Sequence, residues 1–167
     1  YVALYANTTG AKNTANGYCA LKANTTGAQN TATGFGALHA TTTGGNNSAF
    51  GYLAGRFFTT GIQNTAIGSH ALITNSTGSD NTASGFYALR NSTTASKNTA
   101  IGRSAMHSTT TGTNNVAVGY MTLYNNTTGQ LNHATGICSM CLNTSGNYNT
   151  ASGSYSLKGN TTGAYNA

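Results

Sequence analysis

The pattern of small, apolar and polar residues along this chain repeats with a strict period of 17. Each unit opens with Asn, and no insertion or deletion interrupts the spacing between these asparagines. They are Asn13, Asn30, Asn47, Asn64, Asn81, Asn98, Asn115, Asn132, Asn149 and Asn166. A repeat this short and this strict indicates structural units that stack on one another in register, with identical positions forming columns.

The first five positions of the unit, counted from its Asn, have the pattern of a β-strand. Position three is Ala and position five is Gly throughout, whereas positions two and four vary. Position two is Thr or Ser in most units but Val116 and His133 in two of them. One constant small face and one variable face is the period-two pattern of a strand with a confined side. We predict a strand here.

A single column of large apolar residues occupies position nine, broken only by Gly55. We expect this column to form the core opposite the alanines of position three. The core columns are predicted to contain Leu4, Leu21, Leu38, Leu72, Leu89, Leu123, Leu157, Ala15, Ala32, Ala66, Ala83 and Ala117. We predict a second strand or extended run over positions six to ten. Position six is often aromatic, and we expect its rings to stack on one another.

The remaining positions read as turns. Positions twelve to fifteen are Asn-Thr-Thr-Gly in the purest units, and Asn and Gly both favour turns. Helix is disfavoured, because Gly recurs in every unit and β-branched Thr is abundant. The fold prediction is therefore an all-β, parallel β-solenoid or β-roll, with one 17-residue unit per coil and about ten coils. Stacked asparagines should form a hydrogen-bonded ladder, as in other in-register assemblies.

We predict one repeat domain over residues 1–167, with neither end blunted by a capping unit. Exposed solenoid ends favour further pairing. We therefore expect the coils to continue past both termini, in a longer fibre or by end-to-end stacking of subunits.

Composition narrows the function classes. Only 5% of the residues are charged, and the net charge of +6 comes from seven Lys and Arg against the single acid Asp80. The cations look scattered along the sequence, without the basic stripe that nucleic-acid binding requires, so we expect no nucleic-acid partner. No apolar run approaches the ~20 residues of a membrane-spanning helix.

Catalytic chemistry is not predicted. One acid cannot form a catalytic carboxylate pair. His39 and His107 share position ten but lie four units apart, too far to bind one metal ion. Cys138 and Cys141 have C-x-x-C spacing, which we interpret as incidental packing in an extended run. We expect no enzyme activity, no catalytic or metal-binding residue and no cofactor.

The asparagine-rich turns also contain glycosylation acceptor patterns, for which ordinary turn chemistry is the alternative interpretation. The candidate acceptors are Asn7, Asn24, Asn75, Asn126, Asn143 and Asn160.

Residues 98–102 (Asn-Thr-Ala-Ile-Gly) and 114–119 (Asn-Asn-Val-Ala-Val-Gly) resemble the head repeats of trimeric autotransporter adhesins. The longer unit, with its later Ala-Leu and Asn-Thr-Thr-Gly, is similar to repeats of phage tail-fibre and related surface-fibre proteins. The resemblance implies a parallel β-roll, usually a homotrimer, in an extracellular fibre on a cell or virion surface.

Two functions stay open. The first is a structural and adhesive segment of an extracellular fibre or filament, which self-associates as a homotrimer or end-to-end filament and contacts a surface receptor or glycan. The alternative is an ice-binding (antifreeze) solenoid that uses its threonine ladders.

Overall fold

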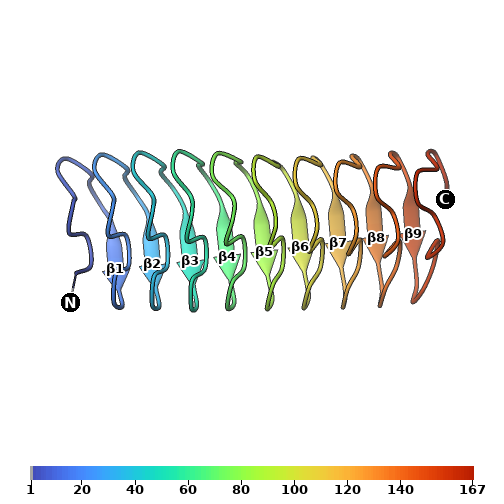
Figure 1. The fold of residues 1–167 in the computed structure, drawn as a ribbon, viewed down its shortest axis with the longest axis horizontal. Coiled ribbons are helices and arrows are strands. Elements are labelled where there is room, and N and C mark those ends of the chain that lie inside the picture. Colours follow the sequence, from blue (N-terminus) through green and yellow to red (C-terminus); the bar gives the residue numbers. More distant parts are fainter. Residues whose placement is uncertain (1) are drawn as a thin grey trace.

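The structure, a computed structural model, describes residues 2–167 and contains strands and turns but no helix within that range. Nine short parallel strands follow one another along a single axis, with the chain ends at opposite ends of the molecule (Figure 1). They are β1 (Thr14–Asn16), β2 (Thr31–Thr33), β3 (Ser48–Phe50), β4 (Thr65–Ile67), β5 (Thr82–Ser84), β6 (Thr99–Ile101), β7 (Val116–Val118), β8 (His133–Thr135) and β9 (Thr150–Ser152).

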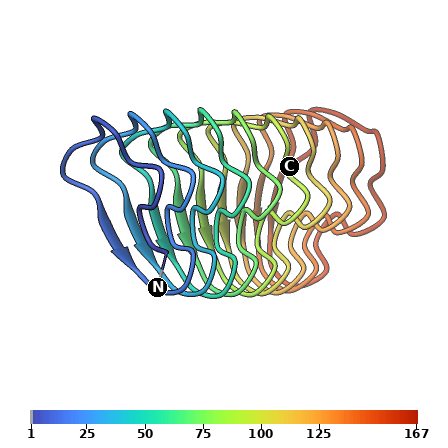
Figure 2. The same cartoon turned by 60° about the vertical axis from the view of Figure 1, so that its left-hand side comes forward.

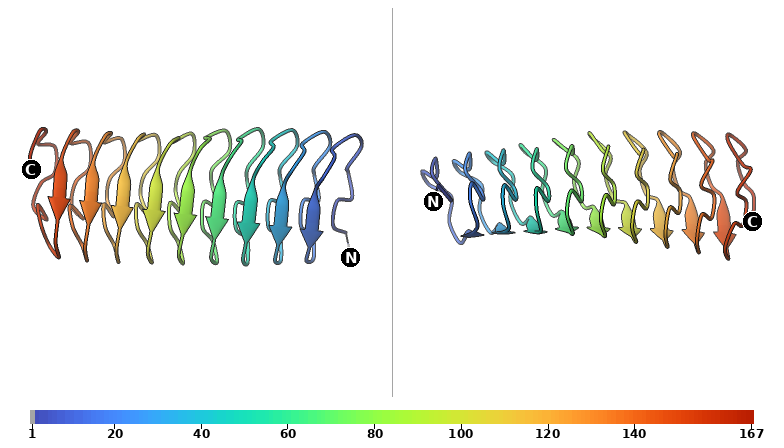
Figure 3. Two further views of the ribbon diagram at one scale, coloured as in Figure 1. Left: turned by 180° about the vertical axis from the view of Figure 1, so that it is seen from behind. Right: turned by 60° about the horizontal axis from the view of Figure 1, so that its bottom comes forward.

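The nine strands form one sheet in chain order, and each pairs in register with its neighbours. In β4 and β5, for example, Ala66 lies opposite Ala83, which holds the same position in the next repeat unit. All strands lie in one row on the same side of the solenoid, and the turns lie on the other side (Figure 3). The predicted all-β parallel solenoid, with one repeat unit per coil, is therefore confirmed.

The core is a thin layer between the sheet and the turns, enclosed by nested coils of similar outline (Figure 2). Position three faces inward from the sheet, and positions eight and nine face it from the turn. Fully buried residues of the predicted columns are Leu21, Leu38, Leu72, Leu89, Leu123, Ala32, Ala66, Ala83 and Ala117. Leu4, Ala15 and Leu157, near the two ends, are partly buried against this cluster.

The predicted extended run over positions six to ten is wrong, because this segment is a turn in the described coils. Positions seven and nine adopt left-handed backbone conformations, as in His70 (φ 59°) and Leu72 (φ 49°). The N–H of His70 donates to the carbonyl of Tyr52 in the preceding coil at 2.9 Å, and that of Leu72 to Ala88 in the next coil at 3.0 Å. A left-handed L-residue costs about 1–2 kcal/mol. Here this conformation lets one turn bond to both neighbouring coils.

The glycine at position five is required by close packing of the coils. Gly85 has a φ of 141°, and a Cβ atom there would lie 2.5 Å from the carbonyl oxygen of Gly102. Neither the conformation nor the contact tolerates a side chain. Each coil can approach the next this closely only because both carry Gly at the corner.

One coil fills its core differently. In the coil of β3, Gly55 replaces the position-nine leucine and Phe58 replaces the position-twelve asparagine, and Phe58 is fully buried. A Cβ atom on Gly55 would lie 3.2 Å from the Phe58 ring. The Phe58 ring therefore fills the space that Leu occupies in other coils. The two exceptions to the repeat compensate for each other.

This compensation makes a specific prediction about stability. Gly55→Leu alone should overpack the core and cost about 1–3 kcal/mol. Phe58→Asn alone should leave a cavity and cost about 3–5 kcal/mol, by analogy with Phe→Ala. The double variant restores the consensus and should recover most of both losses in urea denaturation, since Gly55 already has the left-handed φ of 58°. Additive losses in the double variant would show that the two sites are independent.

Candidate functional site

The folded chain offers surfaces rather than a concave site. Within residues 2–167 there is no pocket and no group of three or more His, Cys, Asp or Glu residues placed to hold a metal ion. None of the elements described is a helix with the length and apolarity needed to cross a membrane. The chemistry of the molecule therefore lies in its side-chain columns, each of which runs along the solenoid.

The asparagines of position one form a continuous buried ladder. The side-chain oxygen of Asn98 accepts from the backbone N–H of Asn115 at 3.0 Å and from its side-chain nitrogen at 3.2 Å. The side-chain nitrogen of Asn98 donates to the carbonyl of Gly112 at 2.9 Å and to Asn81 at 3.2 Å. Each carboxamide thus joins its own coil to both neighbours. Buried members are Asn30, Asn47, Asn64, Asn81, Asn98, Asn115, Asn132 and Asn149, whereas Asn13 and Asn166 are half-buried.

A second, discontinuous asparagine ladder occupies position twelve, where the glycosylation candidates lie. The Asn143 side-chain nitrogen donates to Asn126 at 2.9 Å and to the Gly146 carbonyl at 3.1 Å. Of the candidates, Asn24, Asn75, Asn126 and Asn143 are fully buried, and Asn7 and Asn160 are half-buried. All six side-chain nitrogens donate hydrogen bonds to a glycine carbonyl. Burial leaves no room for a glycan on Asn24, Asn75, Asn126 or Asn143, whereas glycosylation at the half-buried Asn7 and Asn160 stays a prediction.

Two neighbouring columns of hydroxyls behave differently. At position thirteen the hydroxyl bonds to the next coil, as Thr25 Oγ1 does to the Thr42 carbonyl at 3.1 Å. The side chains of position fourteen project into solvent along the whole solenoid. This threonine rank consists of Thr9, Thr26, Thr43, Thr60, Thr77, Thr94, Thr111, Thr128, Ser145 and Thr162. Only one of the two threonine columns is therefore free to contact an external lattice or ligand.

The outer face of the sheet is mixed in character. Phe50, Ile67, Ile101 and Val118 at position four are between 38% and 44% exposed, among threonines and serines. They lie on β3, β4, β6 and β7, in the middle of the row. The middle of the outer face therefore presents an apolar strip to solvent.

Aromatic rings stack along the solenoid at position six, which directly follows the corner glycine. Tyr18, Phe35 and Tyr52 of position six are stacked with ring centroids 5.3 Å apart, as expected. Nearer the C-terminus, rings at position ten also stack: the centroids of His107 and Tyr124 lie 4.9 Å apart. Each ring of the Tyr18–Phe35–Tyr52 stack therefore has another ring against at least one of its faces.

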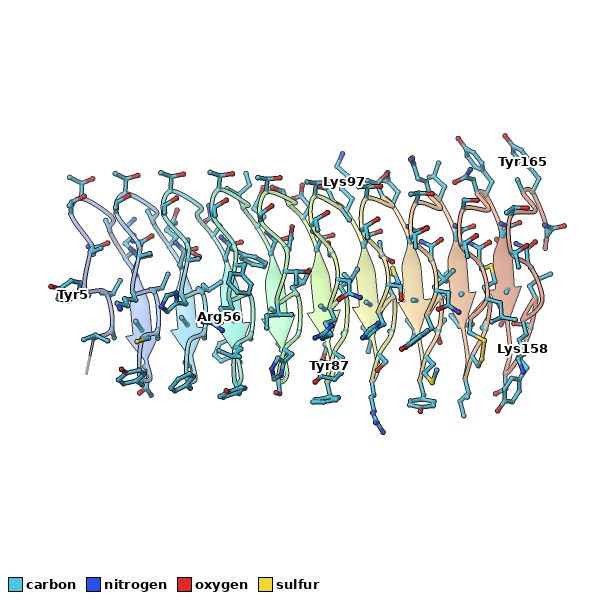
Figure 4. All side chains as sticks on the ribbon, in the orientation of Figure 1. Tyr5, Arg56, Tyr87, Lys97, Lys158 and Tyr165 are labelled. Carbon is cyan, nitrogen blue, oxygen red and sulfur yellow. A yellow bond between two sulfur atoms is a disulfide. The ribbon has the colours of Figure 1, made fainter. Side chains whose placement is uncertain are left out.

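The cations are not scattered once the chain is folded. Four of the seven Lys and Arg share position ten, in a column that we call the basic column: Lys22, His39, Arg56, Arg90, His107 and Lys158. Figure 4 shows Arg56, Tyr87 and Lys158 in the lower half of the molecule and Lys97 at the upper edge. The Arg56 guanidinium lies 5.0 Å from the Phe57 ring centroid, and that of Arg90 lies 5.0 Å from Tyr87. Reading the sequence in columns, rather than for runs of charge, reveals this grouping.

Histidines adjoin these cations. Burial, followed by the Arg56 and Lys22 charges, lowers the pKa of His39 from its ordinary value of 6.5. Burial and the Arg90 charge lower the pKa of His70 and His107 in the same way. Because their pKa is lowered, these imidazoles become half-protonated only below pH 6.5, and protonation of His39 and His107 then adds positive charge within the basic column.

Cys138 and Cys141 form a disulfide, with their Cα atoms 4.8 Å apart. The interpretation of this pair as incidental packing is wrong, because it assumed an extended run in which the two side chains would diverge. The turn brings positions seven and ten of one coil together instead. Cys19 is buried and free.

Comparison with known proteins supplies no family: no protein-family model, curated protein or solved structure matches the chain. The resemblance to adhesin and tail-fibre repeats therefore rests on the repeat motifs alone.

Interruptions of the position-twelve ladder generate a prediction. The buried hydroxyl of Thr109 has no hydrogen-bond partner among residues 2–167, and the Asn126 side-chain nitrogen above it bonds to Gly129. In Thr109→Asn, the new carboxamide should accept from Asn126 and donate to Gly112. We expect a gain of about 1 kcal/mol in the free energy of unfolding.

Urea denaturation measures this gain, and Thr111→Asn, in the exposed threonine rank, is the matched control. The control should change stability by less than about 0.5 kcal/mol. A loss of stability in Thr109→Asn would mean that the column does not accept asparagine at that coil.

Proposed function

We propose that this chain is a structural and adhesive segment of an extracellular fibre. The observation that carries the proposal is the unbroken hydrogen bonding between successive coils, which continues through the turns as well as the strands. Solenoids of this kind depend on nearest-neighbour contacts and are quasi-one-dimensional. A solenoid bonded in this way along its whole length is suited to act as a stiff spacer.

The interior bonding supports the mechanical half of the proposal. The backbone of each strand hydrogen-bonds to the strands of the neighbouring coils. The backbone of each turn also bonds to both the preceding and the next coil, as that of His70 and Leu72 does. The asparagine ladder adds side-chain bonds at the same spacing. Pulling on the axis would have to break many bonds at once at each interface between coils.

The exposed columns support the adhesive half. Positions fourteen and seventeen carry exposed side chains throughout the described coils, and position four does so in most of them. Positions four and seventeen also vary freely in residue type. The fold therefore keeps a constant interior while its surface changes, which is what a fibre needs to acquire new contacts. The Cys138–Cys141 disulfide favours an oxidising, extracellular location.

Self-association belongs to the same proposal. The apolar strip of Phe50, Ile67, Ile101 and Val118 on the sheet is suited to contact with another copy of the chain, as in a homotrimer. End-to-end stacking would use the backbone groups of the terminal coils instead.

Ice binding is the weaker alternative. It is favoured by the exposed threonine rank, which keeps Thr or Ser in every coil. However, the hydroxyls of position thirteen donate hydrogen bonds to the next coil and are not free to bind ice. The outer face of the sheet is also interrupted by bulky apolar residues and by His133. A single rank of hydroxyls defines a line and not a plane, so it matches an ice surface in one direction only.

Force spectroscopy on the chain held at its two termini tests the proposal. We expect a rigid element that unravels coil by coil, each step releasing roughly 50 Å of chain. Gly85→Val should lower the unravelling force by disrupting coil contacts at that corner. Ser84→Val is the matched control, because Val118 occupies the equivalent position naturally.

Smooth extension at low force, like that of a flexible polymer, would refute the spacer function. Thermal hysteresis of the same sample should be absent, and its presence would favour ice binding instead.

A further inference from the structure

We propose that the basic column is a binding site for an acidic polysaccharide, with carboxylate or sulfate groups that lie along the solenoid axis. This inference deepens the adhesive part of the proposed function by naming the class of ligand, and it rests on that part. It comes from three features of the column: unpaired charge, regular spacing and supported side chains.

The charge of the column is uncompensated. Asp80 is the only acidic side chain in the sequence, and it occupies position seventeen. Position seventeen also contains Lys97, which lies at the edge opposite Arg56 and Lys158 (Figure 4). No carboxylate side chain is therefore available to neutralise the basic column. An anionic ligand would be the first counter-charge that its guanidinium and ammonium groups meet.

The cations are spaced regularly. Lys22, Arg56 and Arg90 follow one another at intervals of two repeat units. At about 4.8 Å per coil, two coils span about 9–10 Å along the axis. An extended polysaccharide advances by a similar distance per disaccharide, so one acidic group per disaccharide would meet one cation. Lys158 continues the series four units beyond Arg90.

The arginine side chains are held in place before any ligand arrives. Phe57 lies under the Arg56 guanidinium and Tyr87 under that of Arg90, each with a separation of 5.0 Å. The Arg90 Nη1 atom also donates to Asn91 at 3.0 Å. Fixing a long side chain in advance reduces the entropy lost on binding. A planar guanidinium is also suited to bidentate recognition of carboxylate or sulfate.

A polynucleotide fits this surface less well. A duplex carries one charge per ~1.7 Å of its axis, far denser than cations in every second coil. Single strands are bound largely by bases that stack on exposed aromatic faces. The Phe35 ring is stacked between Tyr18 and Tyr52, and one face of the Tyr124 ring is stacked on His107. These rings stack on one another, and Phe57 and Tyr87 lie under the arginines, so the rings beside Arg56 and Arg90 do not offer a row of free faces for bases.

Fluorescence anisotropy with labelled hyaluronate oligosaccharides, which carry one carboxylate per disaccharide, tests the inference. Arg56→Gln/Arg90→Gln removes two cations from the basic column. Lys12→Gln/Lys97→Gln removes two cations from position seventeen and leaves the same net charge. We expect the first variant to weaken binding about tenfold or more and to make binding less sensitive to salt, because two charged contacts are lost. The second should weaken it less than about threefold.

Equal losses in the two variants would show that attraction is non-specific, and would overturn the inference. So would an absence of binding, or tighter binding to an oligothymidylate of equal charge than to hyaluronate. Neutral dextran should not bind. The force measurements on the spacer do not depend on these results, so either proposal can fail alone.

Discussion

The constraint on which the rest of this structure depends is the buried asparagine at the head of every coil. In the interior coils its carboxamide bonds to a backbone carbonyl of its own coil, as that of Asn98 does to Gly112, and to the asparagines of both neighbouring coils. A shift in the stacking register would leave these polar groups buried without partners, at a cost of about 1–3 kcal/mol each. The ladder therefore explains why the spacing of the repeat tolerates no insertion, whereas the outer positions vary.

The apolar core alone is too thin to account for this order. It consists of alanines facing one large side chain per coil, and that side chain sits on a left-handed residue such as Leu72. Each such conformation opposes folding locally, and the bonds to the coils on either side offset it. The consequence is an element whose stability comes from stacking. A mechanical role and a freely variable surface both follow from that arrangement.

The sequence predicted the repeat, the strand, the Ala–Leu core and the asparagine ladder, because each depends on residues that recur in identical columns. It did not predict the turn over positions six to ten, since left-handed leucines leave no signature in a pattern of apolar spacing. The Cys138–Cys141 disulfide was missed for the same reason. The repeat positions do contain two further features. Gly55 and Phe58 depart from positions nine and twelve of the same unit, and Arg56 and Arg90 share position ten. That position twelve can fill the space of position nine depends on the path of the turn, which residue spacing alone does not indicate.

The most direct test of this account is the stability of Asn98→Ala measured by urea denaturation beside Asn125→Ala. The first removes the acceptor for the Asn115 N–H and the donor to Gly112, whereas Asn125 is half-buried outside both ladders. We expect losses of roughly 2–5 kcal/mol for Asn98→Ala and under about 0.5 kcal/mol for Asn125→Ala. Equal, small losses in the two variants would contradict the claim that the buried asparagine ladder holds the coils in register.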